Sequence, residues 1–376
     1  AEIARMWKKA LNAIPNSEEF KGWYETFTFD GKTPEPGQMI CMPKLADALE
    51  KIADTNTDAL YYGELASRID EESRKFGGFL RKKDLEDHKV EWVDPIHVNY
   101  HGYQVWELPP NGQGIVALMA LNILNNFQFK TRDVDCIHTQ MEALKMAFAD
   151  AKEYVTDPKC MEMPVRDLIS VDYGKQRAKQ IEYRALLPRK DKPHGSGTVY
   201  LCTADKDGNM VSYIQSNYMG FGSGIVVDGV SLQNRGYDFS LDPTHVNYLM
   251  PHKKTYHTII PGFLTKDNKP IGPFGVMGGY MQPQGHMQVV TNMIDFHLNP
   301  QMALDAKRFQ WIENKKFILE PGFDENIISE LKKRGHEIEI EEELAMFGRG
   351  QIIVRLENGV YIAGCESRTD SNIACY

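Results

Sequence analysis

The chain has 376 residues, of which 42% are hydrophobic and 25% are charged, and its 43 basic and 52 acidic residues give a formal net charge of −9. This composition excludes a disordered or collagenous chain and is typical of a globular protein with a sizeable core. The acidic balance excludes an electrostatic nucleic-acid binder, which needs a basic face, and favours a small molecule as the partner.

The cysteines and the apolar segments indicate in which cellular compartment the protein is expected. The six cysteines include no CxxC pair, so we expect reduced thiols and neither a structural zinc site nor a redox motif. The longest apolar run, residues 114–124, is shorter than the roughly 20 residues that span a bilayer. Residues 1–14 are amphipathic and charged, unlike a signal peptide. The sequence therefore predicts a cytoplasmic protein without a membrane segment.

The first half of the chain is predicted to be mainly helical. Apolar residues recur there at three- and four-residue spacings, and Gly77-Gly78 ends one such run. The expected elements are helices at 46–53 and 59–76, a strand at 97–108, and helices at 114–126 and 134–155.

The second half is predicted to be rich in strands. Residues 184–197 (RALLPRKDKPHGSG) come first, and their two prolines, two glycines and lack of any period indicate an exposed linker. The expected elements after it are strands at 198–203, 210–216, 224–227, 258–265 and 352–356, and helices at 284–296, 300–307 and 325–334. The chain thus divides near residue 197.

Thr198 stands directly after the linker and opens a predicted strand. If the chain is cut before Thr198, the freed α-amine, with a pKa of about 8, becomes a base within reach of that residue's own hydroxyl. The hydroxyl can make the cut itself by attacking the carbonyl of Gly197, which offers little steric resistance. On position alone, an ordinary threonine at the start of a strand is the alternative.

Several long motifs resemble the gamma-glutamyltransferase (gamma-glutamyltranspeptidase) family. TVYLCTADKDGNMVSYIQSNYMGFGSG (198–224) resembles the start of the family's small subunit, and LQNRGYDF, GVMGGYMQPQGHMQVVTNMIDFHLNPQMALDAKR and residues 364–376 continue the match. Residues 77–114 and 138–158 resemble the end of the large subunit. The resemblance implies a self-processing N-terminal nucleophile hydrolase with an αββα four-layer sandwich and no cofactor. Residues 1–197 and 198–376 would be its subunits, joined as a heterodimer that could itself dimerise.

The resemblance also implies roles for individual residues. Thr198 matches the nucleophile, and Ser216 matches a hydroxyl that hydrogen-bonds it. Gly278 and Gly279 match the glycine pair whose N–H groups form the oxyanion hole, which suits amides just before a helix. Asp238 matches a carboxylate that binds the substrate α-amino group in glutathione-cleaving members. Without the resemblance, these residues would be a tight turn, a surface carboxylate and a solvated strand serine.

Four positions depart from the glutathione-specific pattern. His257 and Thr258 stand where paired serines grip the glutamate carboxylate, and Tyr218 replaces an expected asparagine. Arg235 stands where glutathione users often carry an acidic or amide side chain. Its guanidinium suits a planar carboxylate or acyl group, or it forms a structural ion pair. These departures favour the branch that resembles cephalosporin acylases and oxamate amidohydrolases.

The sequence therefore predicts an amide hydrolase or acyltransferase that acts on a small amide or γ-glutamyl compound. Two alternatives stay open: a true glutathione hydrolase or transpeptidase, and an unprocessed, non-catalytic homologue. The second is motivated by the family's N-terminal region, whose substrate-binding arginine has no counterpart in these residues. A metal site is not expected, because His245, His252, His257 and His286 lack a carboxylate at a metal-binding helical spacing.

Overall fold

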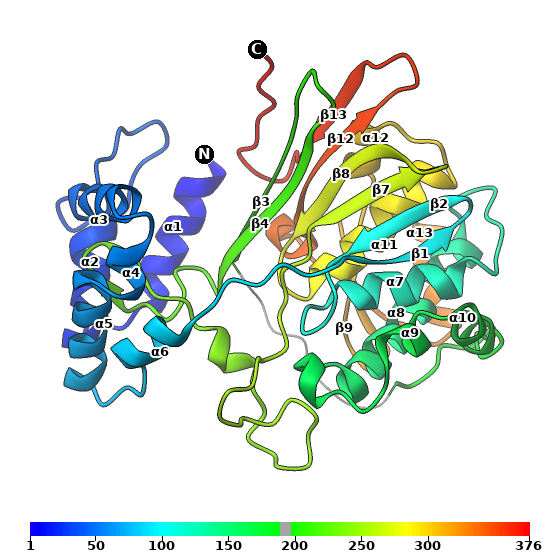
Figure 1. Cartoon of the computed structure of the whole chain (residues 1–376). Coiled ribbons are helices and arrows are strands. Elements are labelled where there is room, and N and C mark those ends of the chain that lie inside the picture. The colour runs from blue at the N-terminus through cyan, green and yellow to red at the C-terminus, as the bar shows by residue number, and fades with distance from the viewer. Residues whose placement is uncertain (189–196) are drawn as a thin grey trace. The chain divides into compact units, whose positions relative to one another are not determined.

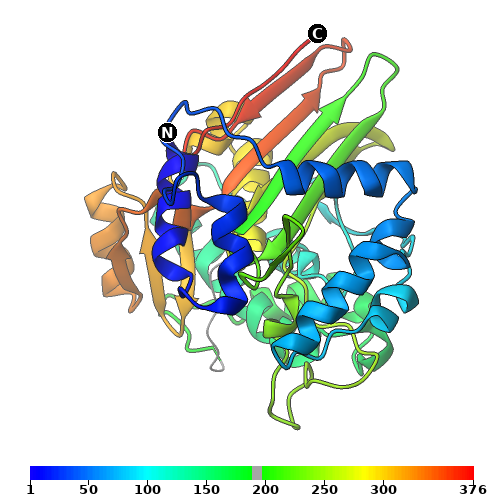
Figure 2. The same cartoon turned by 90° about the vertical axis from the view of Figure 1, so that its left-hand side faces the viewer.

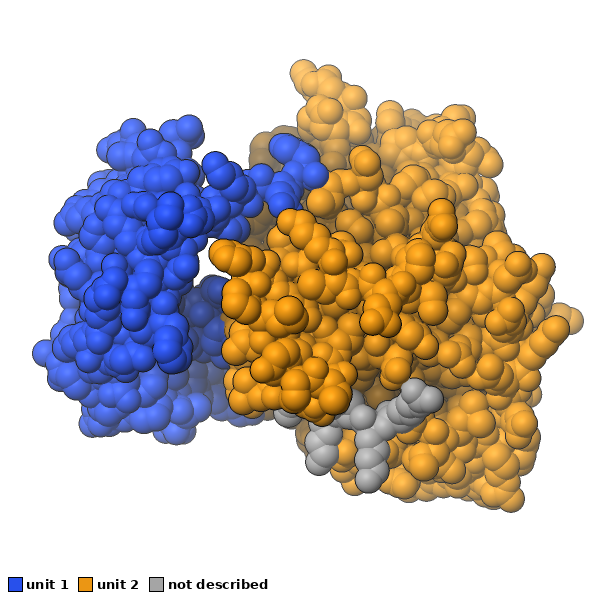
Figure 3. All heavy atoms as spheres, turned by 60° about the horizontal axis from the view of Figure 1, so that its bottom comes forward, with its two compact units in different colours: residues 1–92, 217–234 blue, residues 93–216, 235–376 orange. Residues whose placement is uncertain are grey.

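The computed structural model describes residues 1–188 and 197–376. The chain forms two compact units: unit 1 holds residues 1–92 and 217–234, and unit 2 holds residues 93–216 and 235–376 (Figure 3). The predicted subunit boundary at 197/198 concerns covalent processing and does not coincide with the boundary between these units. Among the described residues, no helix is both long enough and apolar enough to cross a bilayer.

Unit 1 is helical around a small aromatic core. Trp23 and Phe27 lie four residues apart on one face of a helix and pack against Phe221, with 4.6 Å between the ring centroids of Phe27 and Phe221. This contact brings the segment 217–234 into the unit. The elements are α1 (Glu2–Ala13), η1 (Glu18–Phe20), α2 (Lys21–Phe27), α3 (Pro43–Asp54), α4 (Asp58–Tyr61), α5 (Glu64–Lys75), α6 (Lys82–Asp87), β5 (Val226–Val227) and β6 (Val230–Ser231).

The prediction of one continuous helix over residues 59–76 is wrong, because the structure has two helices there, α4 and α5. Gly63 separates the two with a backbone that is not helical, φ −94° and ψ −146°. A Cβ on Gly63 would lie 2.9 Å from the Cα of Ala59, so this close approach requires glycine. Apolar spacing continues on both sides of the break, which is why the pattern predicted a single helix.

Unit 2 is built on a six-stranded antiparallel sheet with the order β1-β2-β7-β8-β12-β13 (Figure 1). Its strands are β1 (Ile96–Tyr100), β2 (Tyr103–Glu107), β7 (Gly262–Lys266), β8 (Lys269–Met277), β12 (Arg349–Arg355) and β13 (Tyr361–Cys365). A three-stranded sheet contains β9 (Phe309–Glu313), β10 (Lys316–Leu319) and β11 (Glu337–Ile340), and β3 (Gly197–Ala204) pairs with β4 (Met210–Tyr218). The helices are α7 (Gly114–Leu124), α8 (Val134–Tyr154), η2 (Pro158–Cys160), α9 (Val165–Leu168), α10 (Val171–Ala178), η3 (Arg235–Asp238), α11 (Met281–Ile294), α12 (Pro300–Asp305), α13 (Glu325–Lys333) and η4 (Leu344–Phe347).

The single strand predicted over residues 97–108 is a β-hairpin instead. His101 and Gly102 have φ values of 46° and 89°, as a two-residue turn with two left-handed residues requires. The Gly102 N–H also donates to Oδ1 of Asn99 at 3.2 Å. A His-Gly pair is a weaker turn signal than Asn-Gly, so the alternating pattern by itself predicts one continuous strand. Strand β8 was missed for a related reason, because the prolines and glycines in KPIGPFGVM hide its period.

Helices cover one face of the six-stranded sheet, and the β3–β4 hairpin lies on the other face alongside β12 (Figures 1 and 2). Strand β8 shows this alternation. The Val276 side chain points to α11, where a Cβ on Gly285 would lie 2.6 Å from it. Gly275 faces the opposite way, and the ring of Tyr200 fills the space that its Cβ would need, at 2.4 Å. The pleat of one strand thus contacts both neighbouring layers.

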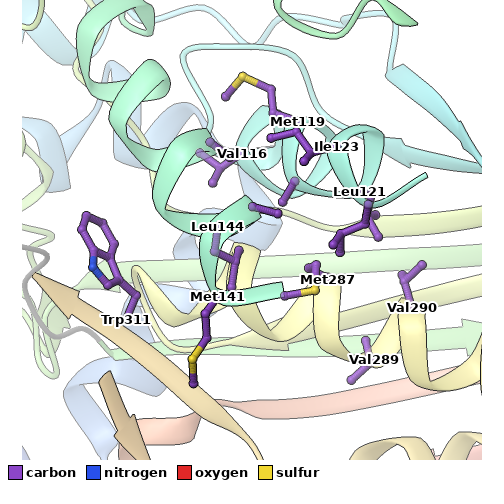
Figure 4. Packing of buried hydrophobic residues seen from close by; sticks show 14 of the residues in the cluster. Val116, Met119, Leu121, Ile123, Met141, Leu144, Met287, Val289, Val290 and Trp311 are labelled. Carbon is purple, nitrogen blue, oxygen red and sulfur yellow. The ribbon is translucent and has the colours of Figure 1, made fainter. Parts of the chain in front are cut away.

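The core lies between the sheet and the helices α7, α8 and α11. Every residue of α7 is buried, as its sequence predicts, since Asn122 is its single polar residue. Figure 4 shows side chains of the three helices meeting there, among them Val116, Leu144 and Met287. The helices predicted at 114–126 and 134–155 are confirmed as α7 and α8.

Helix α11 is fixed against the edge of β9 by two buried glutamines. The Gln284 amide accepts from the N–H of Trp311 at 2.6 Å and donates to its carbonyl at 3.2 Å. Gln288, four residues later on the same face, makes the same pair of bonds with Phe309, at 3.1 Å and 2.9 Å. The helix begins three residues earlier than predicted, because Pro283 lies in its first turn, where a missing N–H costs no helical bond.

Candidate active site

Thr198 is the second residue of strand β3, and its side chain is turned inward. It is 5% exposed, and its Oγ1 lies 3.0 Å from Oγ of Ser216 on β4. Two residues along, Tyr200 makes a similar cross-strand bond of 2.8 Å to Ser212. Alternate residues of a strand share a face, so Thr198 points with Tyr200 toward the six-stranded sheet, whereas Val199 is 54% exposed on the other face. The structure thus brings the predicted nucleophile and its predicted hydroxyl partner together.

The direction of β3 places Thr198 at the end of the sheet where β8 finishes. At the far end of the hairpin, Tyr361 donates from its hydroxyl to the carbonyl of Asp205, and Tyr361 pairs with the last residue of β12. The first residue of β12, Arg349, pairs with Met277, the last residue of β8. Strand β3 therefore runs in the same direction as β12, and its first residue lies toward the Met277 end.

Gly278 and Gly279 form the turn between β8 and α11. Their φ values of 141° and 58° lie in the region that favours glycine. A Cβ on Gly278 would approach the Cα of Gly348 to 3.1 Å. The carbonyls of the pair accept from the first N–H groups of α11, and within residues 1–188 and 197–376 neither glycine donates its own N–H to another described group. The two N–H groups, at the N-terminus of a helix, can therefore donate hydrogen bonds to an oxygen that develops negative charge.

Arg235 and Asp238, at the two ends of η3, form a buried ion pair. Nη1 of Arg235 lies 3.0 Å from Oδ2 of Asp238 and also donates to Oγ1 of Thr258 at 2.8 Å. The Tyr280 hydroxyl donates to the other carboxylate oxygen of Asp238 at 3.4 Å. The guanidinium therefore contacts two predicted substrate-binding residues, Asp238 and Thr258. Of the two roles predicted for Arg235, the structure contains the ion pair.

Gln113 holds the segment that carries His257 and Thr258, although the sequence analysis did not single it out. Its Nε2 donates at 2.7 Å to the carbonyls of both Thr258 and Gly279, and its backbone N–H donates to the carbonyl of His257 at 2.8 Å. One buried side chain thus joins the Thr258 segment to the glycine turn. Nothing in the local sequence around Gln113 signals this role, because the partner Thr258 lies 145 residues away along the chain.

His257 is neutral in this environment. Burial, assisted by the positive charge of Arg235, lowers the pKa of His257 to about 3. Its Nδ1 accepts from the N–H of Ile259 at 3.3 Å, so the ring proton resides on Nε2. His257 can therefore offer a hydrogen bond to a substrate but no charge. Tyr218 ends β4 within unit 1 with a φ of 75°, and its role in substrate binding stays a prediction.

A cavity of about 310 Å³ adjoins the Arg235–Asp238 pair. Its walls come from the end of α8, from η3 and the loop after it, and from the first residue before α11. The lining residues are Lys152, Val155, Tyr237, Asp238, Phe239, Ser240, His245, Asn247, Tyr256 and Tyr280. Because Tyr280 follows Gly279 directly, the cavity lies beside the glycine turn.

One buried group among the described residues has the composition of a metal site: His138, Glu142 and His336. Nζ of Lys145 lies 2.6 Å from Oε1 of Glu142, so the group already contains a fixed cation that would repel a divalent ion. The sequence analysis considered other histidines. Of those, His286 bonds Glu107 at 2.6 Å and accepts from a β8 N–H, which ties α11 to the sheet.

Part of the predicted linker is anchored. Its residues 189–196 lie outside the described residues, but Ala185 is buried and donates its N–H to the carbonyl of Arg334 at 2.8 Å. The N–H of Leu186 donates to Glu142 at 3.1 Å, and its carbonyl accepts from Lys145 at 2.7 Å. The prediction that the whole linker is exposed is therefore wrong at Ala185 and Leu186. Glu142 and Lys145 on α8 form hydrogen bonds with the backbone of Leu186 and hold this part of the linker against the protein.

Comparison with known proteins gives the family. A model of the gamma-glutamyltranspeptidase family matches residues 1–376. The chain is 37% identical over 357 residues to the glutathione hydrolase-like YwrD proenzyme of Bacillus subtilis, covering 92% of this chain and 68% of that protein. It is 30% identical over 364 residues to the oxamate amidohydrolase proenzyme of Klebsiella pneumoniae, covering 94% and 69%.

A solved structure agrees with these relatives. The cephalosporin acylase from Bacillus halodurans superposes with a TM-score of 0.95 at 51% identity, covering 100% of this chain and 70% of that chain. The predicted N-terminal nucleophile hydrolase fold is thereby confirmed. The chain belongs to the gamma-glutamyltranspeptidase family of enzymes, in its acylase-like branch.

Proposed function

We propose that this chain is a self-processing amide hydrolase that forms an acyl-enzyme on Thr198. The observation that carries the proposal is the 3.0 Å contact between Thr198 Oγ1 and Ser216 Oγ, at the end of the sheet where β8 passes into the glycine turn. Relatives named as proenzymes and as an acylase support the same class of reaction.

Processing begins with attack of Thr198 Oγ1 on the carbonyl carbon of Gly197. The peptide C–N bond breaks, an ester forms on Thr198, and the α-nitrogen takes the hydroxyl proton. Water then hydrolyses the ester, which leaves a carboxylate on Gly197 and a free α-amine on Thr198. Ser216 is placed to hydrogen-bond the attacking oxygen throughout.

Turnover uses the same oxygen. The α-amine accepts the Thr198 hydroxyl proton as Oγ1 attacks the substrate amide, and the N–H groups of Gly278 and Gly279 stabilise the oxyanion. A preorganised donor of this kind is typically worth about 3–4 kcal/mol in the transition state. The amine leaves with the proton, and water hydrolyses the acyl ester to regenerate Thr198.

The two pieces produced by the cut are expected to remain together as a heterodimer. Strand β2 from the first piece pairs with β7 from the second along residues 103–106, in the middle of the sheet order. The helices α7 and α8 from the first piece share one buried core with α11 from the second. Neither piece can bury these surfaces alone.

Intact mass under denaturing conditions tests the proposal. We expect two fragments divided at Gly197/Thr198, and a single uncut chain for Thr198→Ala. A mechanism-based acylating probe should add its mass to the fragment that begins with Thr198. An uncut wild-type chain that the probe does not label would overturn the proposal and favour the unprocessed homologue.

True glutathione hydrolysis is the second candidate, supported by the name of the Bacillus subtilis relative and by Asp238. The Arg235–Asp238 ion pair weighs against it, because the carboxylate that would bind an α-ammonium already has a cation at 3.0 Å. The rate of p-nitroaniline release from γ-glutamyl-p-nitroanilide, compared with that from glutaryl-p-nitroanilide, distinguishes the two candidate functions. A preference for the γ-glutamyl compound is expected only if the protein is a true glutathione hydrolase.

A further inference from the structure

Gln113 lies at a junction between the two predicted subunits. It belongs to the first and directly precedes α7, which packs beside α11 of the second (Figure 1). Its side chain is fully buried, and its Nε2 donates at 2.7 Å to the carbonyls of Thr258 and Gly279, which both belong to the second. A primary amide nitrogen carries two hydrogens, so both donors of Gln113 are used on the other predicted subunit.

The glycine turn is held through its two carbonyl groups. The carbonyl of Gly278 accepts from the N–H of Met281 at 3.0 Å. That of Gly279 accepts from the N–H of Gln282 at 3.1 Å and, from outside the helix, from Gln113 at 2.7 Å. Glycine permits many backbone conformations, so the local sequence does not fix the direction of the two glycine N–H groups. The bond from Gln113 restricts rotation of the peptide group that follows Gly279 and therefore favours one arrangement of the turn.

The backbone around Gln113 is fixed independently of its bond to the turn. Nδ2 of Asn111 donates to the carbonyl of Thr255 at 2.6 Å, and the N–H of His257 donates to the carbonyl of Asn111 at 2.9 Å. The N–H of Gln113 donates to the carbonyl of His257 at 2.8 Å. These three bonds place the Gln113 side chain, so the side chain can hold the flexible glycine turn in position.

We propose that Gln113 is a positioning residue for the oxyanion hole, and that its amide keeps the Gly278–Gly279 turn in the arrangement in which both N–H groups meet the oxyanion. The inference rests on the acyl-enzyme chemistry proposed for Thr198. It makes the oxyanion hole of one predicted subunit dependent on a residue of the other, so turnover requires both. Because Gln113 contacts the turn, its loss should slow the chemical step more than it weakens substrate binding.

Two matched variants test the proposal. Gln113→Met keeps the length of the side chain and removes both donors. Gln288→Met is the control, since Gln288 is also buried and its Nε2 also donates to two carbonyls, those of Gln284 and Phe309, away from the turn. Release of p-nitroaniline is measured with γ-glutamyl-p-nitroanilide or glutaryl-p-nitroanilide, whichever the wild-type protein hydrolyses faster, and kcat is expressed per cleaved chain. We expect kcat of Gln113→Met to fall about 10–100-fold and KM to change less than about 3-fold, whereas Gln288→Met keeps both within about 3-fold of the wild-type values.

Gln113→Glu distinguishes positioning from packing. A protonated carboxyl group donates one hydrogen bond in place of two, whereas a carboxylate donates none and would face two carbonyl oxygens. Burial favours the protonated form. We therefore expect Gln113→Glu to retain more kcat than Gln113→Met at low pH, and to lose it relative to the wild-type protein as pH rises and the carboxyl group ionises. A kcat of Gln113→Glu that never exceeds that of Gln113→Met between pH 5 and 9 would overturn the positioning role.

The outcomes separate this inference from the proposed function. Equal kcat values in Gln113→Met and Gln288→Met, or a change in KM alone, overturn the role of Gln113 and leave the Thr198 chemistry standing. If the wild-type chain stays uncut and neither anilide is hydrolysed, the proposed function fails, and amide hydrogen exchange then tests whether Gln113 holds the turn. The N–H groups of Met281 and Gln282 should exchange at least about 10-fold faster in Gln113→Met than in Gln288→Met. Equal exchange rates would overturn the inference.

Discussion

Nδ1 of His138 on α8 lies 2.8 Å from Nε2 of His336, which directly precedes β11. Nε2 of His138 lies 2.7 Å from the carbonyl of Glu182, which can only accept, so this nitrogen carries the proton and Nδ1 accepts from His336. His138 is therefore neutral, and burial keeps His336 neutral as well. The contact joins a helix of the predicted large subunit to the predicted small subunit, close to the residues that precede the proposed cut.

This pair predicts a loss of stability in acid. Burial, assisted by the charge of Lys145, lowers the pKa of His336 to about 2, and burial also lowers that of His138. Unfolded histidines titrate near 6.5, so the stabilisation is fully present above pH 6.5 and is lost as pH falls from there toward 2. Each pH unit in that range costs about 1.4 kcal/mol per histidine kept neutral.

Melting temperatures at pH 7.5 and 5.5 measure this effect. Burial raises the pKa of Glu142, which acts in the opposite sense, so the variant His336→Gln is needed to isolate the histidine. We expect His336→Gln to be less stable at pH 7.5 and to lose less on acidification than the wild-type protein. An identical pH dependence in the two proteins would contradict the neutral histidine pair.

Gly278→Ala should damage catalysis more than folding. Its φ of 141° and the approach of a new Cβ to Gly348 at 3.1 Å would displace the amide that the proposal uses in the oxyanion hole. We expect kcat for an acyl anilide to fall about 10²–10³-fold, with about 1–3 kcal/mol of lost stability from backbone strain. Gly236→Ala is the control, since its Cβ meets no atom within 4 Å. Equal kcat values for the two variants would remove Gly278 from the mechanism.

His257 should not shape the pH profile of activity. With a pKa of about 3 it stays neutral from pH 5 to 9, so His257→Gln should keep the same limbs in a plot of kcat/KM against pH. The acid limb is expected from the α-amine of Thr198, with an ordinary pKa near 8. Loss of a limb with an apparent pKa between 5 and 7 in His257→Gln would show that the imidazole titrates during catalysis.

Glu366→Gln should destabilise the turn that supports Gly278. Oε2 of Glu366 accepts from the Gly350 N–H at 2.8 Å and from Arg308 at 2.9 Å, and Arg308 also donates to the carbonyls of Phe347 and Gly348. Despite burial, the two arginines Arg308 and Arg368 keep the pKa of Glu366 below its ordinary value. Leaving a buried cation without its partner costs about 3–5 kcal/mol. Chemical denaturation of the uncut Thr198→Ala background would measure this, and a change below about 1 kcal/mol would contradict the role of the pair.

The sequence alone determined those features that depend on local pattern. The apolar composition of residues 114–124 and the stripe within residues 134–155 predicted α7 and α8, because a helix that packs into a core must repeat its apolar residues every three or four positions. Resemblance to a family pointed to Thr198, Ser216 and the glycine pair. Where glycine or proline interrupts the pattern, as at Gly63 and in β8, the local signal failed.

Only the tertiary structure decided which of these residues meet. Three contacts join positions that are 23 to 198 residues apart in the chain. They are the hydrogen bond between Arg235 and Thr258, the two hydrogen bonds from Gln113 to Thr258 and Gly279, and the contact between His138 and His336. No periodicity encodes such contacts, because they follow from how the sheet and helices pack against each other. The same packing sets the pKa of His257 and places Lys152 in the cavity wall, since burial and neighbouring charge are properties of the folded chain.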